Sequence, residues 1–402
     1  MLSKAVFLLV AVSLGAQSGF AQDDHPNITD VEVLAEAVSM FSLDVFNKLH
    51  TESKNLLFSP LSGHSALSMV MLGAWNKTLD NFHELLKIED PYTAYIELFQ
   101  DYETMPGIDI VLANGIWAKP TFPIKDEYKG HVGHIFQVEP KTIDISAPKG
   151  PEEPINAWVA NRTNNAITTI LPPSFITADT DILFLNVFFL NASWESPFDA
   201  SKTQDGEFVT ESGETIRTSF MRRDDVEVEV GEMEGFAAKV LRLPFKNYGF
   251  AFYIALPNEN ETLSRLHDFM VNELHDSELF FAHLQTTKVN LYVPKFQLTS
   301  TLNISKKSSM GLDFLFDPDA DFSELSEKHL ALSSGVHKVF IDVKETGIVS
   351  TETPVFEGRQ SRDSSEDFVV KRPFIFFVRD DVKGLLLFQG KLSDPRVTEV
   401  DY

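Results

Sequence analysis

The side chains best suited to chemistry are few and scattered in this sequence. It lacks the Gly-x-Ser-x-Gly elbow of hydrolases, the Walker phosphate loop, the Gly-x-Gly-x-x-Gly turn of dinucleotide-binding domains and the His-Glu-x-x-His zinc motif. It also contains no cysteine, which excludes disulfides, thiol nucleophiles and Cys-liganded zinc. We therefore expect neither an enzyme nor a protein that holds a cofactor.

Two short motifs resemble parts of metal sites. His131 and His134 are three residues apart, but no third ligand is recognisably placed with them, so we expect a loop that carries two histidines. Asp317, Asp319 and Asp321 resemble the start of a calcium loop that lacks its central Gly and its closing Glu, so we expect a solvated acidic turn. The sequence predicts no metal site.

A long polar segment over residues 355–367 is the most unusual feature of the chain. It lies between two strand patterns, and its basic residues are Arg359 and Arg362. Loops of this length in compact domains are usually functional or disordered, and an exposed Arg in such a loop is a site where trypsin-like proteases cut. An ordinary surface loop is the alternative interpretation.

Charge and composition exclude several classes of partner. The chain has 402 residues with 34 Lys and Arg against 59 Asp and Glu, a net charge of -25. Nucleic acid and anionic membranes both require clustered positive charge, so we expect neither as a partner. No stretch after the N-terminus reaches the roughly 18 apolar residues of a membrane span.

The N-terminus has the pattern of a secretory signal peptide. Lys4 precedes an apolar run over residues 5–14, and Gly19-Phe-Ala21 forms a small-x-small cleavage site. We therefore expect a signal peptide at residues 1–21 and an extracellular mature chain at 22–402. The run is too short for the alternative, a membrane anchor. Six Asn-x-Ser/Thr sequons are candidate glycan sites, of which we expect a minority to be used: Asn27, Asn76, Asn161, Asn191, Asn260 and Asn303.

Hydrophobic periodicity predicts helices in the first third and strands in the last half, an α+β pattern. Thr29 and Glu32 form a capping box, Ser59-Pro60 starts a second helix, and residues 156–171 read as a helix that ends at Pro172-Pro173. Expected strands cover residues 182–190, 226–230, 238–243, 250–256, 289–293, 339–343, 374–378 and 385–388.

Motifs across residues 31–395 resemble those of the serpin family. Residues 55–62 read Asn-Leu-Leu-Phe-Ser-Pro-Leu-Ser, residues 155–159 read Ile-Asn-Ala-Trp-Val, and 186–199 hold an Asn followed by Asn-Ala-Ser-Trp-Glu-x-Pro-Phe-Asp. Shorter matches follow in family order at residues 293–296, 310–311, 320–323, 336–338 and 372–379. One motif alone is weak, but this ordered series is specific.

The resemblance implies a single-domain serpin fold of about nine helices and three β-sheets, with an exposed reactive-centre loop at about residues 346–368. It also implies inhibition of serine-type endopeptidases: the protease cuts the loop, which then inserts into the main sheet as a new central strand. The implied partner is an extracellular trypsin-like serine protease, and the implied state is a monomer. Heparin activation is not expected, because residues 90–109, near the family's heparin-binding helix, hold no Lys or Arg.

Two family clusters carry over by motif. The shutter, a polar cluster under the main sheet that must open for insertion, corresponds to Ser59, Ser62, Asn186 and His337. The breach, at the top of the sheet, corresponds to Trp194, Lys295 and Glu345, and we expect the last two to form a salt bridge.

The bait bond is located by family spacing and by chemistry. Counting from the hinge residue Gly347 gives Ser361, whereas counting back from Pro373 gives Arg362. Arg suits a deep acidic specificity pocket, so we place the bond at Arg362-Asp363, with Ser361 and Arg359 as second choices.

The hinge departs from the small-residue pattern of inhibitory serpins. It includes Glu345 and Gly347, and the inserted strand would turn alternate residues to the core, namely Ile348, Ser350, Glu352 and Pro354. A buried carboxylate and a central-strand proline both oppose insertion, so we expect weak or absent trapping. The alternative function is a non-inhibitory serpin acting as a carrier, storage protein, chaperone-like protein or decoy substrate.

Overall fold

The computed structural model describes residues 29–50, 54–177, 180–246, 249–273, 281, 283–304, 311–330, 332, 335–348 and 366–402. Within these residues the helices are α1 (Asp30–Leu49), α2 (Pro60–Met71), α3 (Asn76–Leu86), α4 (Tyr92–Thr104), α5 (Asp126–Phe136), α6 (Glu153–Arg162) and α7 (Leu263–Asn272).

The first two helices begin where the sequence predicts. At α1, Thr29 accepts a hydrogen bond from the Glu32 backbone and Glu32 caps Thr29 in return, which confirms the capping box. At α2, the Ser59 side chain accepts from the Ser62 backbone, and Pro60 occupies the first helical position. Both helices bury apolar faces in the main core.

Two predictions of local structure are wrong. The helix expected to reach residue 171 ends at Arg162, because the Thr163 hydroxyl binds the backbone of Val159 and Ile167 and the next two residues, both Asn, adopt positive φ. The segment of His131 and His134, expected to be a loop, lies in α5.

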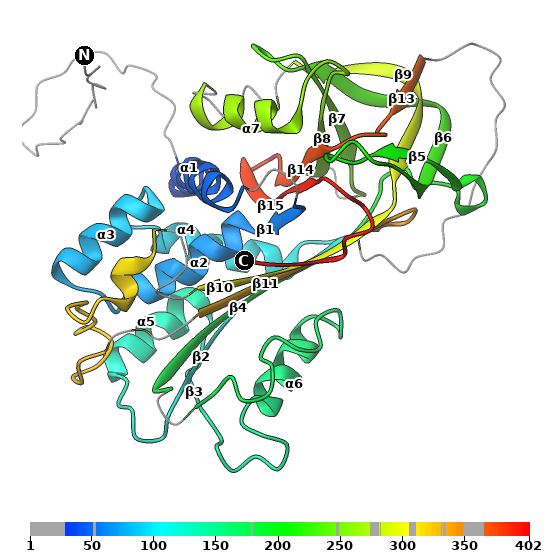
Figure 1. The fold of residues 1–402 in the computed structure, drawn as a ribbon. Coiled ribbons are helices and arrows are strands. Elements are labelled where there is room, and N and C mark those ends of the chain that lie inside the picture. The colour runs from blue at the N-terminus through cyan, green and yellow to red at the C-terminus, as the bar shows by residue number, and fades with distance from the viewer. Residues whose placement is uncertain are drawn as a thin grey trace, which may run out of the picture.

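The main sheet has seven strands, and the candidate site described below lies on it. Its order is β16 (Glu399–Asp401), β10 (Phe296–Ile304), β11 (Gly335–Lys344), β12 (Gly347–Ile348), β4 (Ile182–Ser193), β2 (Ile108–Ala118) and β3 (Lys141–Thr142). Figure 1 shows α6 on one face of this sheet and α1 to α4 on the other. The strand β4 is buried over nearly its whole length because it is covered on both faces.

A second sheet of nine strands packs above α1 and α2 (Figure 1). Its path runs through β1 (Leu56–Phe58), β15 (Leu385–Leu392), β14 (Phe374–Asp380), β8 (Phe250–Pro257), β7 (Ala238–Pro244), β6 (Thr215–Glu232), β9 (Gln285–Pro294) and β13 (Glu366–Val369), with β5 (Gln204–Val209) on β6. The predicted α+β class is confirmed. The described part of the chain contains seven α-helices and two hydrogen-bonded sheets. The family resemblance implied about nine helices and three sheets.

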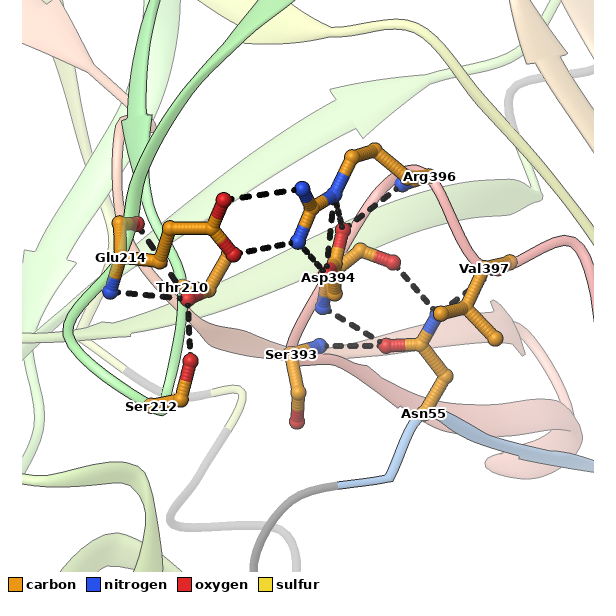
Figure 2. Close-up of polar contacts among 8 residues, drawn as sticks. All are labelled: Asn55, Thr210, Ser212, Glu214, Ser393, Asp394, Arg396 and Val397. Atoms are coloured by element: carbon orange, nitrogen blue, oxygen red, sulfur yellow. Dashed lines mark hydrogen bonds and ion pairs between the residues drawn. The ribbon is translucent and has the colours of Figure 1, made fainter.

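The C-terminal segment is fastened to the start of β1 by Asn55 (Figure 2). Its amide nitrogen donates to the carbonyls of Asp394 and Val397 at 2.7 and 2.9 Å, and its oxygen accepts from the backbone of Ser393 and Asp394 at 2.7 and 2.9 Å. Arg396 adds ion pairs to Asp394 and Glu214. Asn55 is 1% exposed, so this fully satisfied amide explains why Asn opens the motif at residues 55–62.

Gly63, in the middle of α2, has room for a side chain. A Cβ built there would lie 3.8 Å from the Phe41 ring, an ordinary contact. Gly63→Ala should raise the thermal midpoint by about 1 °C or more, because Ala stabilises a helix interior by about 1 kcal/mol relative to Gly and the methyl becomes half-buried. Gly130→Ala is the matched control, since its Cβ in α5 would meet nothing within 4 Å. A midpoint that falls for Gly63→Ala while rising for Gly130→Ala would contradict this packing.

Candidate functional site

A row of polar side chains crosses the main sheet at one level. His337 on β11 is in register with Asn186 on β4, and Asn186 is in register with Asn114 on β2. The Nδ1 atom of His337 lies 2.6 Å from Oδ1 of Asn186, whose Nδ2 donates to Asn114 Oδ1 at 2.9 Å. Three adjacent strands are therefore joined through side chains as well as through the backbone.

Helix α2 completes this cluster from below. The Ser62 hydroxyl donates to Asn186 Oδ1 at 2.7 Å, and the Ser59 backbone N–H donates to His337 Nε2 at 3.4 Å. Ser65 accepts from Asn114 Nδ2 at 3.0 Å. All the members are under 10% exposed, so the four predicted shutter residues lie together in one buried hydrogen-bonded cluster.

These contacts fix the protonation state of His337. The Asn186 oxygen can only accept, so Nδ1 carries the proton, and Nε2 is left to accept from Ser59. A second proton on Nε2 would face the Ser59 N–H. Burial lowers the pKa of His337 to about 4, and the neutral ring is the form that fits the cluster.

Above the cluster the sheet is open between β4 and β11. These parallel strands pair directly over residues 184–188 and 335–339. At the top, β12 fills the gap: Ile348 pairs with Val343 on one side and with Ala192 on the other. Ile348 is fully buried. The first two residues beyond the β11 turn thus already occupy the position of a central strand.

Gly347 makes this entry possible. Its φ is +149°, and a Cβ there would lie 2.0 Å from the Ala192 carbonyl oxygen. Only glycine fits such a contact. The backbone of the hinge therefore turns into the sheet at Gly347.

Polar groups hold the top of the sheet around this entry. Glu345 accepts from Lys295 at 2.9 Å, as the predicted salt bridge requires, and from the Thr203 hydroxyl at 2.7 Å. Burial opposes ionisation of Glu345, but the Thr203 hydrogen bond and Lys295 together hold its pKa below the ordinary value. Trp194 donates its indole N–H to the Lys344 carbonyl at 2.9 Å and stacks on Phe245.

The sequence missed three members of these clusters. Asn114 is a polar residue among apolar neighbours in a strand, and this pattern could have predicted a buried hydrogen bond. Ser65 lies one turn beyond Ser62 on α2, also a usable signal. Thr203 follows a short turn, and nothing in its sequence context marks it.

Several predicted residues lie outside the described part of the chain. These are Ser350, Glu352 and Pro354 of the hinge, Arg359, Ser361, Arg362 and Asp363 of the bait region, and the signal peptide with Asn27.

Other candidate sites are limited in the described residues. No group of three or more His, Cys, Asp or Glu there could hold a metal ion. None of the described helices has the length and apolarity to cross a bilayer. Helix α4, near which heparin would be expected to bind, exposes acidic side chains, namely Glu97, Asp101 and Glu103.

Residues 36–395 match the family model of serpins, the serine protease inhibitors. The chain belongs to the serpin family. Human Serpin B3 is 26% identical over 388 residues, which cover 90% of this chain and 99% of Serpin B3. Among solved structures, Serpin48 of the insect Tenebrio molitor is 26% identical with a TM-score of 0.77, covering 92% of this chain and 99% of Serpin48.

The family holds both inhibitory and non-inhibitory members. Human thyroxine-binding globulin, solved with thyroxine, has a TM-score of 0.80 at 21% identity and covers 91% of this chain and 100% of its own. That likeness concerns the fold alone. Because both kinds of member share the fold, the fold does not by itself decide which role this chain has.

Acid should destabilise this serpin through His337. The unfolded chain takes up the proton near pH 6.5 and the folded chain only near pH 4, so the stabilising contribution is complete above about pH 6.5 and is lost as the pH falls towards 4. The loss amounts to about 3 kcal/mol. Unfolding free energies measured across this interval should decline less steeply in His337→Gln than in the wild type.

A remaining slope is expected in that variant, because burial also lowers the pKa of His64 to about 4. His134→Gln, at an exposed position on α5, serves as the control and should keep the wild-type slope. Equal slopes in His337→Gln and the wild type would show that His337 is not held neutral.

Proposed function

We propose that this chain is a secreted serpin that offers Arg362-Asp363 as bait to trypsin-like serine proteases and is cleaved faster than it traps them. The observation that carries the proposal is the register of β12. Ile348 is aligned with Val343 and Ala192. Continuing that register inward aligns Ser350 with Ile341 and Leu190, a level at which β4 and β11 do not pair with each other.

The next inward-facing residue meets a closed sheet. In the continued register Glu352 is aligned with Val339 and Phe188, which pair directly with each other and are both fully buried in the main core. Insertion at this level must separate β4 from β11 and place a carboxylate in apolar surroundings. An unpaired buried charge costs several kcal/mol, or the group must take up a proton.

Pro354 would reach the level at which a side-chain contact adds to the backbone pairing of β4 with β11. The same register aligns it with His337 and Asn186, so its arrival requires the 2.6 Å contact between these side chains to break. Proline brings no N–H to replace the lost ladder bond. Glu352 and Pro354 would therefore both be placed at levels where β4 and β11 are directly paired and must first separate.

Insertion competes with hydrolysis of the acyl-enzyme, and each 1.4 kcal/mol added to the insertion barrier slows it about tenfold. The wild-type mature protein mixed with trypsin should give a cleaved band on an SDS gel, with the protease still active. Glu352→Ala with Pro354→Ala should raise the ratio of boil-resistant complex to cleaved product at least about tenfold.

The matched control is Thr351→Ala with Thr353→Ala, which alters the alternate positions of the same segment. These positions would face away from the core, so the control should partition as the wild type does. If both double variants form complex equally, the inward-facing side chains do not limit insertion. A wild-type complex as abundant as that of an efficient inhibitor would overturn the proposed substrate behaviour.

The bait bond has its own test. N-terminal sequencing of the small fragment released by trypsin should begin at Asp363, because Arg fits the acidic specificity pocket of such proteases. Arg362→Ala should move the cut to another bond and slow it. A wild-type cut after Arg359 would mean that the bait bond lies three residues closer to the hinge than proposed.

A non-inhibitory role is the second candidate, and the same hinge register supports it. A loop that cannot insert beyond Ser350 leaves the fold available as a carrier, storage protein, chaperone-like protein or decoy substrate. Thyroxine-binding globulin, solved with thyroxine, shows that this fold can bind a small molecule.

We propose that Asn260 is the main glycan acceptor among the described sequons. It is exposed in the turn between β8 and α7. By contrast, the amides of Asn76 and Asn191 donate to Asp321 and Asp109 at 2.8 and 2.9 Å. The sequon of Asn161 ends in Thr163, whose hydroxyl is buried within the chain.

The protein secreted from eukaryotic cells should therefore carry a glycan on Asn260. Glycosidase treatment should remove it and increase the mobility of the protein on an SDS gel. Asn260→Gln should remove one glycan from the secreted protein, whereas Asn76→Gln should leave the pattern unchanged. Loss of a glycan in Asn76→Gln but not in Asn260→Gln would reverse this assignment.

A further inference from the structure

An apolar cavity of about 90 Å³ lies beneath the main sheet, next to the polar cluster. Its walls come from α1, α2, β4, β10, β11 and the short helical turn η3 (Asp313–Phe316). The lining includes Phe41, Phe184, Leu302 and Leu315, so most of the surface is hydrocarbon. Cavities of this kind exclude water but accept small apolar molecules.

Small residues on α2 create the space. Gly63 and Ala66 are three residues apart and share one face of the helix. Both are partly exposed, although their neighbours Ser62 and Ser65 are fully buried. The unfilled space therefore borders this face of the helix.

The Ser59 hydroxyl at the edge of the cavity has an unused donor. Asn186 and His337 also line the cavity, but their hydrogen bonds to each other, Ser62, Asn114 and Ser59 occupy the acceptor and ring atoms. The Ser59 oxygen accepts from the Ser62 backbone. Its own hydroxyl hydrogen has no acceptor among the described residues, and the side chain is only 1% exposed.

From this arrangement we propose a binding site for a small apolar molecule of one six-membered ring with a single hydrogen-bond acceptor. The volume of about 90 Å³ is below the roughly 150 Å³ of a cavity that binds benzene, so a single ring is the largest group that the cavity can hold. The Ser59 hydroxyl donates to the acceptor, and the remaining contacts are with hydrocarbon. A buried donor that gains a partner in this way favours the ligand with the acceptor over its hydrocarbon analogue.

The site joins elements that insertion would separate. A ligand there contacts α2, β4 and β11 together, and loop insertion past Ser350 parts β4 from β11. The bound molecule therefore opposes insertion, a consequence that rests on the proposed function. The binding itself does not depend on any protease, so it is tested without one.

Acetophenone and ethylbenzene are suitable probes because they share a ring and differ in one carbonyl oxygen. Saturation-transfer NMR titrations with the purified mature protein should show saturable binding of both. Ala66→Leu, which fills the cavity, should weaken both at least about tenfold, while Ala160→Leu on α6, across the sheet, should bind as the wild type does. Ser59→Ala should weaken acetophenone about tenfold and leave ethylbenzene unchanged.

Circular dichroism establishes that each variant is folded, and Gly63→Leu replaces Ala66→Leu if the latter is not. Wild-type protein that binds neither probe in a saturable manner overturns the site. So does binding by a folded cavity-filling variant that matches the wild type. An equal effect of Ser59→Ala on both probes overturns the role of the hydroxyl as the donor.

Discussion

The direct pairing of β4 with β11, reinforced by the contact between Asn186 and His337, is the constraint on which the rest of this structure depends. Below it the main sheet is closed and braced by the serines of α2. Above it the two strands diverge, and the hinge enters at Gly347. The position of this closure decides how much of the loop the sheet can accept without first breaking its own contacts. In the register that we propose, that limit falls between Ser350 and Glu352.

The closure is made of neutral groups, and this choice has a physical reason. A buried ion pair would lose its partner when strands part, which is costly. Neutral hydrogen bonds can be exchanged for others at a smaller loss. The charged pair, Lys295 with Glu345, is placed instead at the top of the sheet, where Lys295 is 39% exposed. The polar cluster itself therefore holds no permanent charge, although β11 carries the ion pair of Asp342 with Lys344 nearer its end.

Sequence patterns predicted the helix starts at Thr29 and Ser59 and the central parts of strands such as β4, β8 and β14, because caps and buried apolar runs are local signals. They did not predict β2 or β10 of the main sheet. They failed at the end of α6, where two Asn residues leave the helix although the apolar pattern continues. The order of strands could not be predicted from the residues, since pairing between distant segments has no local signal. Three features could not be predicted because they depend on how several strands are aligned with one another. These are the polar row through Asn114, the gap above that row and the position of Ile348 in the gap.

In the mechanism that we propose, the described sheet has the features that loop insertion requires, whereas the sequence of the loop departs from them. Gly347 has the backbone that entry demands, the gap above the closure is present, and Ile348 already fills its first inward position. Aliphatic bulk at that position favours partial entry, because the side chain is buried without opening any β4 to β11 pair. The same hydrophobic gain cannot continue, since the later inward positions are a serine, a glutamate and a proline. We therefore attribute the weak trapping that we propose to two side chains, Glu352 and Pro354, and not to the sheet that would receive them.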